Sequence, residues 1–257
     1  MLRLPDGFVR PIDLSNLRDP AVLYARSYLL IRTVVGVIGI LLPLAFILGE
    51  AVFLGGGVQV RGSISAFYHT SMRDIFVGAL CVVGLLLITY MAGQVKRPDW
   101  WLSLVAGIAV LGVVFFPTDR PNLPDGAPLC GTSPEPPGCS PVQQRLGETP
   151  VATIHFVCAA VFILSLAAIC FYFAYREQRA GNGGVAWFQR ICGLVIVAAV
   201  VLVAVGALTH WDLGERTPLY VGEVVSIWAF GASWLMGSRD LWRRAVPVLA
   251  PPTVKPA

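Results

Sequence analysis

The sequence predicts an all-α polytopic membrane protein, with six transmembrane helices in one bundle and both termini in the cytoplasm. Two observations predict this fold class. Of the 257 residues, 56% are hydrophobic and only 13% are charged, whereas a soluble domain carries about 25% charged residues. Apolar runs of about 18 residues or more also recur along the chain, and each is long enough to cross the roughly 30 Å hydrocarbon layer of a bilayer.

Six apolar runs are expected to be the spans, and they make residues 1–257 a single membrane domain. The runs cover about residues 28–49, 72–94, 100–116, 150–175, 187–209 and 218–237. Thr149-Pro150 and Thr217-Pro218 each place a capping residue before a proline, which predicts the starts of the fourth and sixth spans. The third span is expected to stop at Pro117.

Basic residues and one cysteine pair predict the orientation. Arginine and lysine gather in the N-terminal tail, in the turns after the second and fourth spans, and in the C-terminal tail. The positive-inside rule therefore places both termini in the cytoplasm. The long loop at 118–148 is then extracytoplasmic, where Cys130 and Cys139 are expected to form a disulfide.

The charge pattern also limits the function classes. The net charge of +4 comes from residues in short loops and tails, which set the topology of a membrane protein, so no nucleic-acid partner is expected. Both lysines, Lys96 and Lys255, lie outside the apolar runs, which excludes a buried Schiff-base lysine. Membrane lipids are the expected partners.

A dense polar stretch from Ser63 to Asp74 precedes the second apolar run. Ser65, His69 and Arg73 are spaced by four, so they share one face if the helix begins early enough. Arg73 is expected near the outer membrane surface, either as an interfacial anchor or as a ligand for a lipid phosphate.

All three histidines and two acids fall on the outer side of the membrane in this topology. They are His69, His155, His210, Asp119 and Glu223. His155 and Glu223 each lie five residues past the proline that starts their span, so both are roughly 7–8 Å below the helix start. Ionisable groups at such depth are costly, and they tend to pair with one another and to mark function.

Three interpretations of this group remain open. The three imidazoles can hold a zinc ion, with Asp119 or Glu223 orienting a ligand or acting as base on the metal-bound water. The same residues, with Arg73 and Asp74, can instead satisfy one another in a structural polar plug. A third interpretation is a cofactor or transport role, such as axial haem ligation or a proton relay.

The polar stretch also carries a family resemblance. Its serines, followed by Tyr68-His69-Thr70 and Arg73-Asp74, resemble the signature of a group of uncharacterised bacterial multi-pass proteins, which implies a location in the bacterial inner membrane. More distantly, Ser65 four residues before His69 resembles the first motif of the CREST superfamily, which includes alkaline ceramidases. Members of that superfamily have seven spans and a zinc site built from a serine, an aspartate and three histidines.

The CREST resemblance implies a metal-dependent hydrolase that cleaves a lipid amide or ester. Ser65 would steady the oxyanion, the three histidines would hold zinc, and Asp119 or Glu223 would carry the proton. The superfamily's H-x-x-x-H in the last helix has no counterpart here, and the sixth span offers Glu223 instead. The alternative is a non-enzymatic lipid-binding, transport or accessory membrane subunit.

Overall fold

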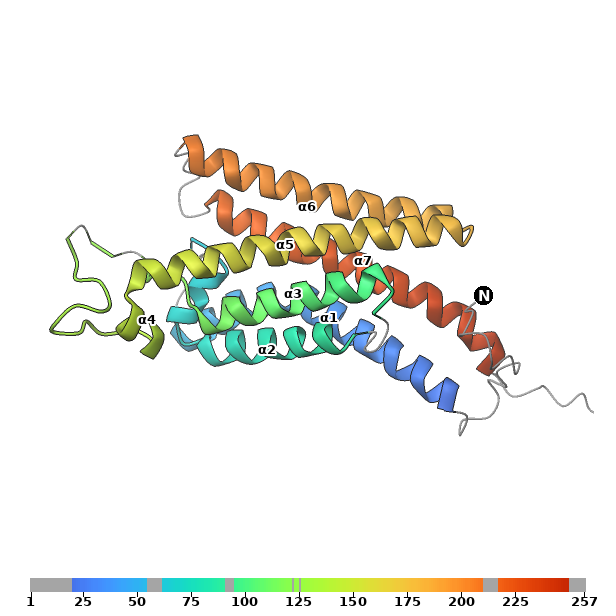
Figure 1. Ribbon diagram of the computed structural model, residues 1–257, viewed down its shortest axis with the longest axis horizontal. Coiled ribbons are helices and arrows are strands. Elements are labelled where there is room, and N and C mark those ends of the chain that lie inside the picture. The colour runs from blue at the N-terminus through green and yellow to red at the C-terminus, as the bar shows by residue number, and fades with distance from the viewer. Residues whose placement is uncertain are drawn as a thin grey trace, which may run out of the picture.

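Long helices lying side by side along one axis make up the fold (Figure 1). The computed structural model describes residues 20–54, 62–90, 95–121, 123–124, 126–209 and 217–249. Its helices are α1 (Pro20–Leu54), the 3-10 helix η1 (Ser65–His69), α2 (Arg73–Thr89), α3 (Pro98–Phe115), α4 (Pro141–Leu146), α5 (Glu148–Arg179), α6 (Gly183–Thr209) and α7 (Pro218–Leu249).

Five of the described helices are long and apolar enough to cross a membrane, namely α1, α3, α5, α6 and α7. The sixth long helix, α2, has 17 residues, at the lower limit of the usual length of a span. Large apolar side chains such as Leu85, Leu194 and Val201 are exposed on the outside of the bundle. An exposed apolar surface of this kind suits lipid rather than water, so the protein is an integral membrane protein.

The helices form a ring in an order that differs from their order in the chain. Going round the bundle, each helix packs on the next in the order α1, α7, α6, α5, α3 and α2, and α2 lies more loosely against α1. Helix α5 also contacts α7 across the middle. This arrangement places residues from distant parts of the sequence around one shared interior.

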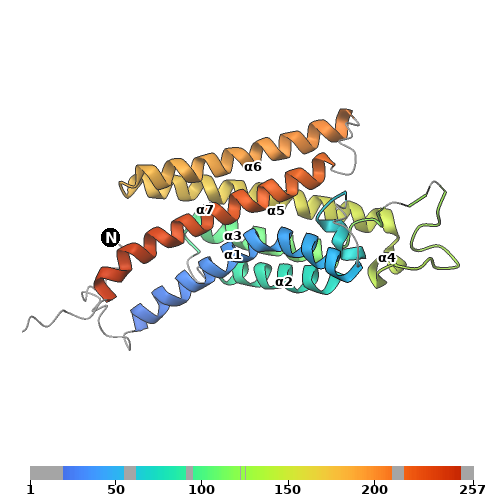
Figure 2. The ribbon, with the colours of Figure 1, turned by 180° about the vertical axis from the view of Figure 1, so that it is seen from behind.

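The two ends of the bundle are different. The segment that carries α4 lies at one end, and the start of α1 lies at the other (Figures 1 and 2). We call the described residues of 117–147 the cap. Aromatic side chains fill the bundle next to the cap, where the Phe46 ring lies 5.0 Å from that of Phe67 and 5.9 Å from that of Phe76. A second core surrounds Trp234 in the opposite half.

Prolines and one glycine determine where several helices begin. Helices α3, α4 and α7 start at Pro98, Pro141 and Pro218, because the first helical position needs no hydrogen-bonding N–H and suits the fixed φ of proline. Helix α5 begins at Glu148, directly after Gly147, whose φ of +89° favours glycine. The predicted start of this helix at Thr149-Pro150 is therefore one to two residues late.

A helix lies at each of the six predicted apolar runs, but two local predictions were wrong. Ser65, His69 and Arg73 do not share one helical face, because η1 ends at His69, Thr70 is extended, and α2 begins only at Arg73. The region 118–148 is not all loop either, since it contains α4. Helices α1, α5, α6 and α7 also extend beyond the predicted bounds.

A buried carboxylate joins two helices at the end opposite the cap. The Asp99 side chain, at the start of α3, is 0% exposed. Its oxygens accept hydrogen bonds from Arg97 at 3.1 Å and from Arg176 of α5 at 2.9 Å. The pairing compensates the burial of the charge, and it ties the α3 start to the α5 end.

The contact between α2 and α3 generates a test of the fold. A Cβ atom at Gly107 would lie 2.7 Å from the Gly84 carbonyl oxygen and 2.7 Å from Ile88 Cγ1. We expect Gly107→Ala to lower the Tm of the detergent-solubilised protein, because a backbone oxygen cannot move aside without shifting a helix.

Gly78→Ala is the matched control, because nothing lies within 4 Å of a Cβ at that position of α2. Alanine favours a helix over glycine by about 1 kcal/mol, so this variant should melt at or above the wild-type temperature. Equal Tm values for the two variants would show that α2 and α3 do not meet at Gly107.

Candidate functional site

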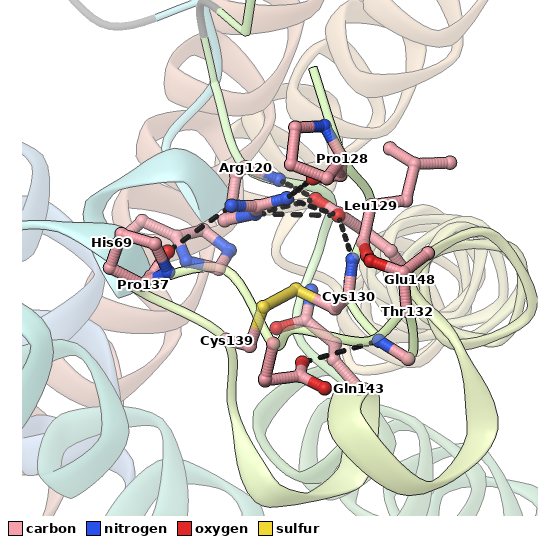
Figure 3. A network of polar contacts seen from close by, with 12 residues as sticks. His69, Arg120, Pro128, Leu129, Cys130, Thr132, Pro137, Cys139, Gln143 and Glu148 are labelled. Atoms are coloured by element: carbon pink, nitrogen blue, oxygen red, sulfur yellow. Dashed lines mark hydrogen bonds and ion pairs between the residues drawn. A yellow bond between two sulfur atoms is a disulfide. The ribbon is translucent and has the colours of Figure 1, made fainter. Parts of the chain in front are cut away.

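The centre of the cap end is a buried ion pair between Arg120 and Glu148 (Figure 3). Arg120 follows α3, and Glu148 is the first residue of α5, where the helix dipole favours a carboxylate. Arg120 Nη2 lies 2.9 Å from Glu148 Oε2, and the two side chains are 10% and 1% exposed. The Arg120 backbone N–H also donates to Glu148 Oε1 at 2.8 Å.

The same pair holds the loop that carries the disulfide. Arg120 donates to the carbonyl oxygens of Pro128 at 2.8 Å and Pro137 at 3.1 Å, and the Cys130 N–H donates to Glu148 Oε2 at 3.0 Å (Figure 3). Every one of these bonds involves a charged group, which makes it stronger than a bond between neutral groups. Arg120 and Glu148 therefore fix the cap to the ends of α3 and α5.

Cys130 and Cys139 are joined by a disulfide, as the sequence analysis predicts, with an S–S distance of 2.08 Å. Cys130 is buried against the Glu148 carboxylate, while Cys139 is partly exposed. The bond closes the loop directly beside the ion pair (Figure 3).

His69 and Gln143 meet at one backbone oxygen. His69 Nε2 lies 2.8 Å from the Thr118 carbonyl oxygen, and Gln143 Nε2 donates to the same oxygen at 3.0 Å. Because the partner of His69 is a carbonyl, Nε2 is the protonated ring nitrogen in this contact. His69 thereby links η1 to the cap.

Glu223 and Ser65 also meet, in the bundle interior beneath the cap. Glu223 Oε2 accepts from the Ile64 backbone N–H at 2.6 Å, and Glu223 Oε1 accepts from the Ser65 hydroxyl at 3.3 Å. The Glu223 carboxyl of α7 therefore caps the start of η1, where backbone N–H groups have no helical partner. Of the three predicted catalytic residues, Ser65, Asp119 and Glu223, the structure therefore joins Ser65 and Glu223 by a hydrogen bond.

A cavity of about 50 Å³ lies beside this pair, several times what one water molecule needs. Glu223 and Ser65 supply its polar edge. The rest of the wall is apolar and comes from Ile64, directly before η1, and from α1, α2, α3, α5 and α7, through residues such as Leu42, Phe76 and Ala159. We call this space the outer cavity.

His155 is held in a defined tautomer. It is 1% exposed, and its Nδ1 lies 2.8 Å from the Phe116 carbonyl oxygen and 3.1 Å from the Val113 carbonyl oxygen. Two carbonyl partners require a proton on Nδ1, which leaves Nε2 with a free lone pair. Nε2 is buried and has no hydrogen-bond partner among the described residues.

Asp119 and Arg73 lie at the surface. Asp119 is exposed and accepts from the Thr118 hydroxyl at 2.8 Å. Arg73 donates to the Tyr68 hydroxyl at 2.7 Å, and its guanidinium carbon lies 4.5 Å from the centre of the Tyr68 ring. The exposed Arg73 guanidinium is thus fixed in place at the cap end.

The described residues do not assemble the expected metal centre. Among them, the only group of three potential ligands within 4.8 Å of one another is Cys130, Glu135 and Cys139, and its two sulfur atoms already form the disulfide. His69 and His155 use one ring nitrogen each on backbone carbonyls. His210 lies outside the described residues.

The residues that organise the cap were not predicted from the sequence. Arg120 directly follows Asp119, and a single arginine in a long polar loop carries no signal that it is buried in an ion pair. Glu148 precedes the predicted helix start, a position where a carboxylate is typical. Ser140 and Gln143 form a capping box around Pro141, and this pattern of serine, two residues and glutamine could have revealed α4.

Comparison with known proteins gives a family but no activity. A family model described as "Protein of unknown function (DUF998)" matches residues 37–236. Neither the curated proteins nor the solved structures contain a significant match.

The contact of His69 with the cap predicts a pH dependence. The pKa of His69 lies below the ordinary value of 6.5, chiefly because burial disfavours the charged ring, against the opposing effects of the Thr118 carbonyl and the Glu148 charge. The unfolded chain therefore takes up this proton at a higher pH than the folded protein. The stabilisation from neutral His69 is complete above about pH 6.5 and is lost as the pH falls through the lowered pKa.

His69→Gln should make the Tm less dependent on pH between about 7.5 and 5, because the glutamine amide stays neutral and can still donate to the Thr118 oxygen. Thermal unfolding across this range, measured on both proteins, checks the expectation. If the two profiles fall in parallel, His69 does not contribute to the pH dependence.

Proposed function

The chain belongs to the DUF998 family, and we propose that it binds the apolar chain of a lipid in the outer cavity without catalysing a reaction. The observation that carries this proposal is the composition of the cavity wall, which is apolar except for the Glu223 carboxyl and the Ser65 hydroxyl. Ligand sites commonly combine apolar walls with a few polar groups that set the orientation of the ligand.

The hydrogen bonds at the polar edge support binding rather than hydrolysis. Both Glu223 oxygens already accept bonds from η1, one from the Ile64 N–H and one from the Ser65 hydroxyl. The Ser65 hydroxyl donates its proton to a carboxyl, so it is not directed at an oxyanion. In this account the two side chains fix η1 as the lid of the cavity, and the apolar chain of the ligand packs against the apolar wall.

Metal-dependent lipid hydrolysis is the second candidate, and His155 is the observation that favours it. A metal-binding histidine usually donates one ring N–H to a carbonyl or carboxylate and uses the other nitrogen as ligand. His155 has this arrangement, with Nδ1 on two carbonyls and a buried, unpartnered Nε2. Zinc at this nitrogen would need further ligands, for which His69, His210 and Asp119 are the candidates.

We further propose a topology of six spans, with α2 as the sixth and with both termini in the cytoplasm of a bacterial inner membrane. A 17-residue helix is within the range that can span, and α2 packs along α3. The disulfide supports a cap on the oxidising side of the membrane. Membrane lipids are then both the surroundings and the source of the ligand.

Filling the outer cavity tests lipid binding. Ala159 lines the cavity, and Ala159→Leu adds three carbon atoms there. We expect native mass spectrometry to detect a bound lipid on the purified wild type and none on the variant, with little change in Tm. Ala160→Leu is the matched control, because Ala160 is exposed on the outside of α5 and its replacement should leave lipid binding unchanged. Equal lipid content in all three proteins would contradict the proposal.

Metal analysis distinguishes the second candidate. If His155 is a zinc ligand, the purified protein should contain about one zinc per chain, and His155→Ala should lose it. The lipid-binding proposal expects no such difference. Elemental analysis by mass spectrometry provides the measurement, and a wild type free of metal after purification in zinc-containing buffer would exclude the zinc site.

A further inference from the structure

A second polar cluster lies in the half of the bundle opposite the cap, and the proposed function does not use it. It consists of Arg32 of α1, Gln189 of α6 and Trp234 of α7. Arg32 is only 4% exposed, and the other two residues are 0% exposed. Polar and charged side chains are costly inside membrane helices, where they mark binding sites and transport paths more often than packing.

Aromatic rings surround the guanidinium of this cluster. The Arg32 guanidinium carbon lies 4.5 Å from the centre of the Phe173 ring and 5.1 Å from that of Trp234. Arg32 Nη2 also lies 3.5 Å from the Trp234 carbonyl oxygen. Stacking on aromatic faces is a usual way to hold an arginine cation away from water.

Gly237 brings the guanidinium and the amide together. A Cβ atom at this position would lie 2.5 Å from Arg32 Nη2 and 3.1 Å from Gln189 Nε2. Both nitrogen atoms therefore lie beside the same point of α7, one turn from Trp234. They already occupy the place that a Cβ atom would take, so only glycine allows the guanidinium and the amide to lie this close to α7.

Three polar atoms of the cluster have no hydrogen-bond partner in the part of the chain that the structure describes. They are Gln189 Nε2, Gln189 Oε1 and Trp234 Nε1. Leaving a buried polar group unsatisfied is strongly unfavourable, and nearly all such groups in proteins have a partner. The missing partner must supply acceptors for the amide and the indole N–H.

We propose that this cluster is a binding site for a phosphoryl group. Its oxygen atoms accept hydrogen bonds from Trp234 Nε1 and Gln189 Nε2, and the Arg32 cation supplies the complementary charge. Gln189 Oε1 accepts from a protonated phosphate oxygen or from a headgroup hydroxyl. Arginine has five N–H donors, so Arg32 can keep its existing contacts while it faces the ligand.

The position of the cluster suits a lipid headgroup as well as a free anion. Gln189 lies six residues after the start of α6, which is about 9 Å along the helix axis. This depth is within reach of the headgroups at the membrane face opposite the cap. The site is independent of the outer cavity, so either proposal can fail without the other.

Ligand-dependent stabilisation tests this site in the full-length protein in detergent. Inorganic phosphate or micelles containing phosphatidic acid should raise the Tm by at least a few degrees, because a ligand that binds only the folded state stabilises it. Gln189→Leu keeps the size of the side chain but removes the amide, and it should abolish this shift. A wild type whose Tm responds to neither phosphate nor phosphatidic acid would overturn the proposal.

A control separates a ligand site from a buried amide without function. If no ligand binds at the cluster, Gln189→Leu should raise the basal Tm, because it removes unsatisfied polar groups. Phosphate should then change the Tm of this variant and of the wild type equally. These two results together would also overturn the proposal. Ser103→Ala, which removes another buried and unpartnered hydroxyl, should keep the full response.

A response to phosphatidic acid alone would identify a lipid headgroup as the source, and a response to both would indicate a free phosphate site.

Discussion

The cap end of the protein depends on the buried ion pair between Arg120 and Glu148. Removing charges from water is costly, and the pair is stable only because further hydrogen bonds satisfy both groups. The cap supplies these bonds through the carbonyls of Pro128 and Pro137 and the N–H of Cys130. The dependence is mutual, because the same bonds hold the cap over the bundle. His69 then binds the segment that follows α3 and brings η1 under the cap.

This arrangement explains why the outer cavity exists. The lid of the cavity is η1, which is attached on one side to the cap through His69 and on the other to α7 through Glu223. Helix η1 is not continuous with α2, because the chain is extended at Thr70 between them. A short helix fixed at its two ends by side chains leaves room beneath it that a packed transmembrane helix would fill.

The sequence was sufficient for the helices but not for the roles of the polar residues. Apolar runs and prolines predict helices well, because burial in lipid requires backbone hydrogen bonds to be made within each segment. The disulfide was predictable from two cysteines in one polar loop. The partners of His69 and His155, in contrast, are backbone carbonyls in the last turn of α3 and directly after it, and no side-chain pattern reports them. Arg32, Gln189 and Trp234 were equally hidden, because they come from three helices and become neighbours only in the folded ring.

The most direct test of this account is the effect of Glu148→Gln on the stability of the protein and on the hydrogen exchange of the cap. Removing one charge of a buried pair leaves the other uncompensated, so the free energy of unfolding should fall by about 3–5 kcal/mol, and cap amides such as Cys130 should exchange faster. Glu135→Gln, at an exposed carboxylate of the same cap that accepts one bond from Gly131, should change little. If the two variants unfold and exchange alike, the Arg120–Glu148 pair does not hold the cap.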